Sequence, residues 1–145
     1  MSEKPNKRAN YIASAIFNLI FLWVVNKIPD WNIIFITDKF VAVLWALNLS
    51  IAVQIAANFM LIFYNPLFLH YLAETGIALV SLIAVFVVYT VFPFDFSFVG
   101  DWLNLIIKIA LLIGVVGTGI TAIVNLVRFF KALKSETGDT AEEDE

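Results

Sequence analysis

The sequence predicts an all-α integral membrane protein, a four-helix bundle whose transmembrane helices run up-down-up-down. Its residues are 61% hydrophobic and only 14% charged, with a mean hydropathy of +0.91. Soluble domains are usually closer to about half apolar and a quarter charged. Apolar runs of roughly 20 residues, the length that a helix needs to cross hydrocarbon, alternate with short polar segments. Because lipid offers the backbone no hydrogen bonds, such runs are expected to be helical.

The first apolar run, residues 11–28, is predicted to be an uncleaved transmembrane helix. Residues 1–10 before it are polar and basic, and a charged start followed by an apolar run also resembles a secretory signal peptide. No small-x-small cleavage pattern follows the run, because residues 26–30 read Asn-Lys-Ile-Pro-Asp. We therefore expect residues 1–10 to form a cytoplasmic N-terminus and 11–28 to span the membrane.

The middle of the chain predicts two long spans joined by a tight turn. Residues 29–39 form an outer loop, and residues 40–64, which carry no charge, form the second span. Residues 65–66 are Asn-Pro, which suits a cytoplasmic turn because Asn caps helices and Pro favours their first turn. Residues 67–92 form the third span.

The last part of the chain predicts a second outer loop, a fourth span and an acidic tail. The loop is residues 93–101 and the span is residues 102–127. Residues 128–145 form a cytoplasmic basic helix end followed by a tail that, being acidic and free of aromatic residues, is expected to be disordered. Alternation of Phe with polar residues over 94–98 favours an extended segment, which is expected either to lie against residues 33–37 as an outer cap or to enter the lipid headgroups.

Basic residues predict the orientation, since the cytoplasmic ends of spans carry an excess of Lys and Arg. One side of the predicted bundle holds Lys4, Lys7, Arg8, Arg128, Lys131 and Lys134, and the other holds Lys27, Lys39 and Lys108. The aromatic residues of the interfaces divide in the same way, with Tyr11, Tyr64 and Tyr71 on the first side and Trp23, Trp31, Trp45 and Trp102 on the second. We therefore expect a multi-pass protein of the cell membrane with both termini cytoplasmic.

Glu74 is the acidic residue that falls inside a predicted span. It follows Pro66 by eight residues, which places it about 12 Å along the helix from the turn. An ionised carboxylate at the bilayer centre costs about 2.5–3.5 kcal/mol, so its depth matters. Three interpretations stay open: an interfacial pair with His70 at i and i+4, a buried structural hydrogen bond, or a functional acid.

Counting along the four spans predicts a polar layer in the cytoplasmic half of the bundle. Its residues lie at comparable distances from the cytoplasmic ends, and those on one helix are spaced three or four apart, so they share a face. A proton or cation site is the functional alternative to simple hydrogen bonding in such a layer. The predicted members are Asn18, Gln54, Asn58, Glu74, Thr121 and Asn125.

Two further features of the fourth span have competing interpretations. Lys108 lies six residues from its outer end, so it is expected to extend to the interface, with an anion path as the alternative. Residues 117–122 spell a dinucleotide fingerprint, but no strand precedes them and they lie within one apolar run, so that reading is rejected. Small residues four apart instead predict close helix packing through Gly114, Gly117, Thr118 and Thr121, against a helix of the same chain or of another copy.

The composition excludes several function classes. The chain has no cysteine and one histidine, His70, which removes disulfides and thiolate metal sites. No catalytic, cofactor-binding or metal-binding motif appears, so we expect no enzyme and no cofactor, and the lack of a basic aromatic surface argues against nucleic acid. The expected partners are the lipid bilayer and either further copies of the chain or a larger membrane complex.

Two functions remain. The first is a structural or accessory membrane bundle, and the alternative is a small proton- or ion-coupled transporter or channel subunit that uses Glu74. A transporter would need an oligomer, because a four-helix chain of this size leaves little room for a pathway.

Overall fold

The structure, a computed structural model, describes residues 7–64 and 66–142 and is all-helical over its long elements, as predicted. Four of its helices are long and apolar enough to cross a membrane. The helices are α1 (Lys7–Lys27), the short 3-10 helix η1 (Ile28–Trp31), α2 (Phe40–Phe63), α3 (Leu67–Val91) and α4 (Asp101–Glu142).

The helix boundaries lie close to the predicted ones, with one correction at the C-terminus. Helix α1 begins at Lys7, before the predicted residue 11, and α2 and α3 each end one residue earlier than expected. The expected disorder from residue 135 is wrong as far as Glu142, because α4 continues to that residue. Extending an existing helix needs no new nucleation, which favours this continuation. The predicted polar start at 1–6 and the last residues, 143–145, lie outside the described residues.

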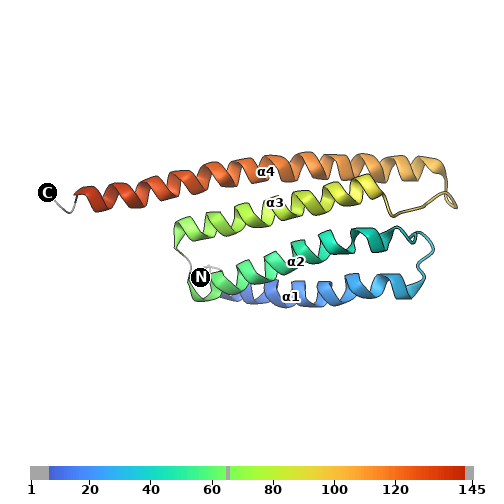
Figure 1. Ribbon diagram of the computed structural model, residues 1–145, viewed down its shortest axis with the longest axis horizontal. Coiled ribbons are helices and arrows are strands. Elements are labelled where there is room, and N and C mark those ends of the chain that lie inside the picture. Colours follow the sequence, from blue (N-terminus) through green and yellow to red (C-terminus); the bar gives the residue numbers. More distant parts are fainter. Residues whose placement is uncertain (1–6, 65, 143–145) are drawn as a thin grey trace, which may run out of the picture.

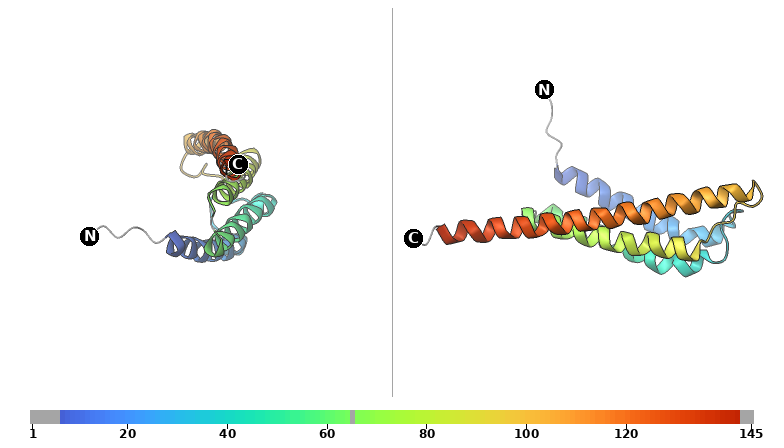
Figure 2. Two further views of the ribbon diagram at one scale, coloured as in Figure 1. Left: turned by 90° about the vertical axis from the view of Figure 1, so that its left-hand side faces the viewer. Right: turned by 90° about the horizontal axis from the view of Figure 1, so that it is seen from above.

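The four long helices lie side by side in sequence order, with their connections at alternating ends of the molecule (Figure 1). Extensive contacts in the described chain join α1 to α2, α2 to α3 and α3 to α4. Viewed end-on, the row curves, so that α1 and α4 form the two edges of an open arc (Figure 2). The bundle is therefore open between α1 and α4.

The two ends of the bundle are packed differently. We call the end with the 28–39 and 92–100 connections the loop end, and the end with the α2–α3 connection the turn end. Large apolar side chains form the core near the loop end, namely Val25, Phe40, Val43, Ile51 and Val88. The core near the turn end is smaller and consists of Ala57, Leu61 and Ala73. Polar side chains consequently have more room in the turn-end half.

The two long connections at the loop end are joined, which confirms the predicted cap. An isolated antiparallel bridge pairs Ile36 with Phe94. Thr37 donates two hydrogen bonds to the carbonyl oxygen of Pro93, from its backbone N–H at 2.9 Å and from its hydroxyl at 3.1 Å. Pro93 itself is among the most deeply buried side chains. The cap ties the α1–α2 connection to the α3–α4 connection.

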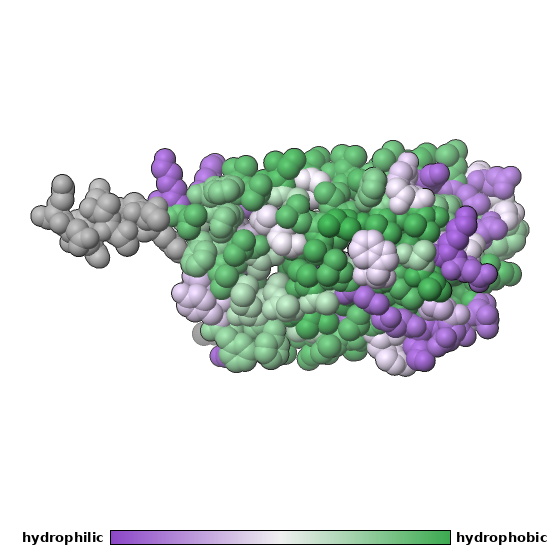
Figure 3. Space-filling model, viewed as in Figure 1, coloured by the Kyte–Doolittle hydropathy of each residue, from purple (hydrophilic) through white to green (hydrophobic). Residues whose placement is uncertain are grey.

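Most of the surface between the two ends is apolar (Figure 3). The apolar surface is most exposed on α4. Only 6% of the residues in its apolar segment are buried inside the chain, against 33% of those in the apolar segment of α2. Monomeric soluble proteins rarely expose contiguous apolar patches beyond a few hundred Å². The four apolar helices are therefore compatible with a multi-pass membrane protein.

Candidate functional site

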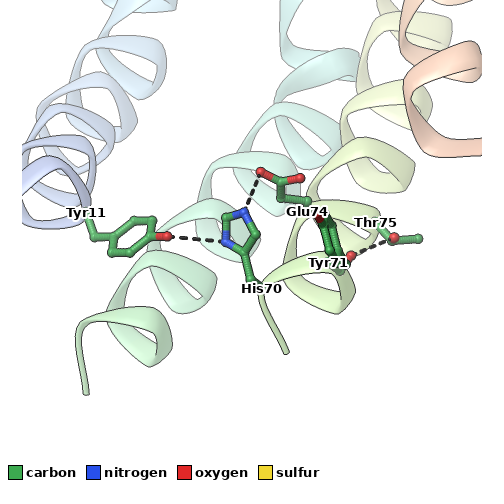
Figure 4. A network of polar contacts seen from close by, with 5 residues as sticks. All are labelled: Tyr11, His70, Tyr71, Glu74 and Thr75. Carbon is green, nitrogen blue, oxygen red and sulfur yellow. Dashed lines mark hydrogen bonds and ion pairs between the residues drawn. The ribbon is translucent and has the colours of Figure 1, made fainter. Parts of the chain in front are cut away.

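Glu74 lies in a polar network near the turn end that joins α3 to α1 (Figure 4). The His70 Nε2 atom is 3.2 Å from a carboxylate oxygen of Glu74, which confirms the predicted i, i+4 pair. The other ring nitrogen, Nδ1, is 3.2 Å from the Tyr11 hydroxyl. A neutral imidazole with its proton on Nε2 makes both bonds, because it donates to the carboxylate and accepts from the phenol.

Sequence reasoning missed the contribution of Tyr11 to this network. Tyr11 and His70 are 59 residues apart, and no spacing pattern links positions on two different helices. The side chains of His70 and Glu74 are 29% and 37% exposed, so the pair is half-buried within the chain. The network therefore lies on the open side of the bundle rather than in its core.

Asn58 does not face Glu74 as the depth count predicted. Its amide donates to the Ser14 hydroxyl of α1 at 3.1 Å and to the backbone carbonyl of Gln54 at 2.8 Å. Asn58 is 8% exposed and lies at the contact between α1 and α2. Counting along the helix does not give its rotation, and the amide of Asn58 bonds to α1 rather than to α3.

A second polar contact continues from α2 to α3. Gln54 donates to the Ser50 hydroxyl at 3.4 Å, and the hydroxyls of Ser50 and Ser81 are 3.3 Å apart. These side chains border a cavity of about 310 Å³ that all four long helices line. Ser81 lies seven residues after Glu74, so the two share a face of α3. That spacing was the sequence signal that would have added Ser81 to the predicted layer.

The largest hollow beside Glu74 lies between α3 and α4, and we call it the α3–α4 groove. It has a volume of about 530 Å³ and opens to the surface. It brings together three of the predicted polar residues, Glu74, Thr121 and Asn125. Its lining residues are Glu74, Ile77, Ala78, Ser81, Thr118, Thr121, Asn125 and Arg128.

Five of the six predicted members of the layer therefore fall into two groups. Glu74, Thr121 and Asn125 line the α3–α4 groove. Gln54 and Asn58 lie at the contacts of α2 with its neighbours. The sixth member, Asn18, is buried on α1 with 6% of its surface exposed.

The predicted packing residues of α4 lie partly at its contact with α3 and partly on its outer face. A Cβ added at Gly114 would lie 3.5 Å from Val85 of α3, so this position is at the helix contact. A Cβ added at Gly117 would meet no atom within 4 Å, so no helix of the described chain packs on it, and packing against another copy stays a prediction. The hydroxyls of Thr118 and Thr121 donate to carbonyl oxygens of their own helix, at 2.8 and 2.9 Å.

Lys108 lies over aromatic rings near the loop end. Its Nζ atom is 5.8 Å from the ring centroids of both Tyr89 and Phe92, within the range of cation–π attraction. The amides of Asn48 on α2 and Asn26 on α1 bond to each other, at 2.7 and 3.0 Å, so Asn48 is paired away from Lys108. This arrangement favours the interfacial interpretation of Lys108 over an anion path.

Comparison with protein-family models, curated proteins and solved structures found no match to this chain. The chemistry of the site must therefore be inferred from its own side chains. A carboxylate, an imidazole and a phenol in one hydrogen-bonded network can hold a proton or a cation. Within the described side chains, no group of three His, Asp or Glu residues gathers in metal-binding proximity.

Proposed function

We propose that this chain is a structural or accessory protein of the cell membrane that assembles with further copies of itself or with a larger membrane complex. One observation carries the proposal: the bundle is open between α1 and α4, and most of the apolar surface of α4 has no partner in the described chain. In water such a surface would aggregate, whereas in lipid it is free to pack against other helices.

The polar side chains of the α3–α4 groove also require an occupant in a membrane. Glu74, Thr121 and Asn125 border a groove that opens to the surface. Polar groups that face hydrocarbon without partners are costly, and those inside spans almost always face a protein interior or a water-filled cavity. An occupant of the groove that brings polar groups of its own would remove this cost.

Gly117 supports the same proposal from the outer face of α4. It lines a shallow apolar hollow of about 430 Å³ with Leu112, Ile113, Val116 and Ile120. Small residues beside such hollows let a second helix approach closely in membranes. Because no atom of the described chain lies near a Cβ added there, the helix that packs on Gly117 would come from another chain.

Cross-linking in native membranes tests the assembly. The chain has no cysteine, so Val116→Cys introduces a single thiol beside the hollow, to which a benzophenone maleimide is attached. We expect photo-cross-linked products heavier than the 16.3 kDa chain, at twice that mass for a second copy. The same probe at Gly76, where an added Cβ also meets open space, serves as the control. Products restricted to the monomer at both positions would overturn the proposal.

The proposed topology is up-down-up-down with both termini in the cytoplasm. It is supported by the alternating connections and by the basic residues Arg128 and Lys131 near the turn end. A membrane-impermeant thiol reagent added outside intact cells should label Ser97→Cys and spare Ser135→Cys. Labelling of Ser135→Cys from outside would reverse the orientation.

Ion-coupled transport is the second candidate, and the position of Glu74 favours it. Glu74 borders an open groove and is bonded to His70, while the loop-end half is closed by a larger apolar core. A hydrophobic carbodiimide, which reacts with protonated carboxyl groups in apolar settings, should label the wild type and not Glu74→Gln. Labelling that depends on Glu74 would support transport, and no Glu74-dependent labelling would exclude it.

A further inference from the structure

The α3–α4 groove continues beyond Arg128 into a second hollow of about 280 Å³ near the turn end. Arg128 lines both hollows, so they are consecutive stretches of a single seam between α3 and α4. The α4 positions of the seam recur every three or four residues, as expected for one helix face. The second hollow is lined by Leu67, Tyr71, Arg128, Lys131, Ala132 and Ser135.

Charges of both signs line this seam without neutralising each other. Glu74 and Arg128 border the same hollow, but the side chain that Glu74 contacts is His70, at 3.2 Å. Among the described side chains, neither Arg128 nor Lys131 takes part in an ion pair. A carboxylate and two cations that share one seam and stay apart are complementary to a ligand that carries both charges.

The residues around the seam indicate that its ligand is a lipid rather than a soluble metabolite. Arg128 is the first charged residue after the uncharged stretch 109–127. Val127 and Phe130, beside it on α4, are exposed and apolar. In a bilayer, a cation at the end of an apolar span lies at the level of the lipid phosphates. A molecule that enters the seam from the side therefore has its polar part at Arg128 and its apolar part against α3 and α4.

We propose that this seam binds a phospholipid with an ethanolamine headgroup. Its phosphate lies between Arg128 and Lys131, since guanidinium and ammonium groups form charge-assisted hydrogen bonds with phosphate oxygens. Its ammonium group faces the Glu74 carboxylate, and its acyl chains follow the apolar wall that includes Ile77. The Tyr71 side chain lines the phosphate end of the seam.

Glu74 sets the choice of headgroup. A carboxylate attracts an ammonium group and accepts its N–H bonds, whereas the quaternary ammonium of choline has no N–H to donate. A phosphatidylglycerol headgroup brings negative charge with no cation to meet Glu74. The seam should therefore prefer phosphatidylethanolamine over both other lipids.

Native mass spectrometry of the full chain tests this preference. The protein is exchanged into micelles that contain equal amounts of phosphatidylethanolamine, phosphatidylglycerol and phosphatidylcholine with the same acyl chains. We expect phosphatidylethanolamine to be retained about tenfold more than phosphatidylcholine, the factor expected for a charge-assisted hydrogen bond. Preferential retention of phosphatidylglycerol, or equal retention of all three lipids, would overturn the proposal.

Three variants separate the two halves of the headgroup. Glu74→Gln should abolish the preference for ethanolamine over choline and still retain lipid, because the phosphate contacts remain. Lys131→Gln should lower the retention of all three lipids about equally. Lys134→Gln removes the same charge one turn away, at a residue that does not line the seam. This variant should retain all three lipids as the wild type does. Equal losses in Lys131→Gln and Lys134→Gln would indicate diffuse electrostatic attraction and refute a defined site.

A soluble ligand with the same headgroup is the remaining source to distinguish. Glycerophosphoethanolamine carries the same phosphate and ammonium but no acyl chain. At the concentration that saturates lipid binding, we expect it to displace less than a tenth of the bound phosphatidylethanolamine. Complete displacement would overturn the lipid as the ligand. The proposal rests on the membrane location but on no partner chain, so a purely monomeric protein would leave it standing.

Discussion

The paired amides of Asn26 and Asn48 should couple α1 to α2 measurably. Each amide nitrogen donates to the oxygen of the other, at 2.7 and 3.0 Å, so the pair makes two hydrogen bonds. Interhelical hydrogen bonds in membrane proteins contribute about 0.6 kcal/mol on average. Two such bonds predict a coupling free energy of about 1.2 kcal/mol, roughly an eightfold change in the unfolding equilibrium.

A double-mutant cycle isolates this coupling. The free energy of unfolding is measured in mixed micelles for the wild type, Asn26→Ala, Asn48→Ala and the double variant. Asn26 also donates to its own helix at the Leu22 carbonyl, a bond that cancels from the cycle. A matched cycle between Asn26 and Asn104, which contacts the other connection, should show no coupling beyond about 0.5 kcal/mol. A coupling free energy between Asn26 and Asn48 of no more than about 0.5 kcal/mol would refute the reasoning.

Two further predictions concern the cap and the α3–α4 contact. The Ser97 hydroxyl and then its backbone N–H bond to Asp95 and lower the pKa of that exposed carboxyl below 3.8. The charged form therefore favours the fold, and this stabilisation is present above pH 3.8 and lost as the pH falls through the lowered pKa. A carboxyl NMR titration should give a midpoint below 3.8 that rises in Ser97→Ala, and an unchanged midpoint would contradict it. Gly114→Leu should destabilise the fold by about 1–3 kcal/mol in micelle unfolding because it overpacks the contact with Val85, whereas Gly117→Leu should change it by less than about 0.5 kcal/mol.

The helices and the cap were predictable from the sequence because their signals are local. An uncharged run longer than the bilayer needs defines α2, and the Asn-Pro step at 65–66 ends it. The alternating Phe residues of 94–98 suggested the extended segment that pairs with Ile36. The tail was mispredicted because its composition argued for disorder, whereas an already formed helix extends through it to Glu142.

The contacts of the candidate site could not be predicted by counting residues along the helices. Residue counting placed Asn58 and Glu74 at one depth, yet their partners depend on how each helix is rotated about its axis. Asn58 consequently bonds to Ser14, and Glu74 to His70. The pairing of Tyr11 with His70 joins two helices that are far apart in the sequence, and no local pattern could have indicated it.

The curvature of the helix row could not be predicted from the sequence either. All four spans carry apolar residues on most faces, so periodicity does not say which face meets which neighbour. Gly114 and Gly117 looked equivalent as small residues, but the first faces Val85 and the second faces outward. The difference between them identifies the surface through which we expect the protein to assemble.

The most direct test of that assembly is the mass of the protein in lipid nanodiscs drawn from native membranes without detergent. Wild type and Gly76→Leu should give the same assembly, larger than one 16.3 kDa chain. Gly117→Leu should shift the mass toward the single chain, because its side chain fills the hollow on the free face of α4. A single-chain mass for the wild type, or an assembly unaffected by Gly117→Leu, would contradict assembly through this face.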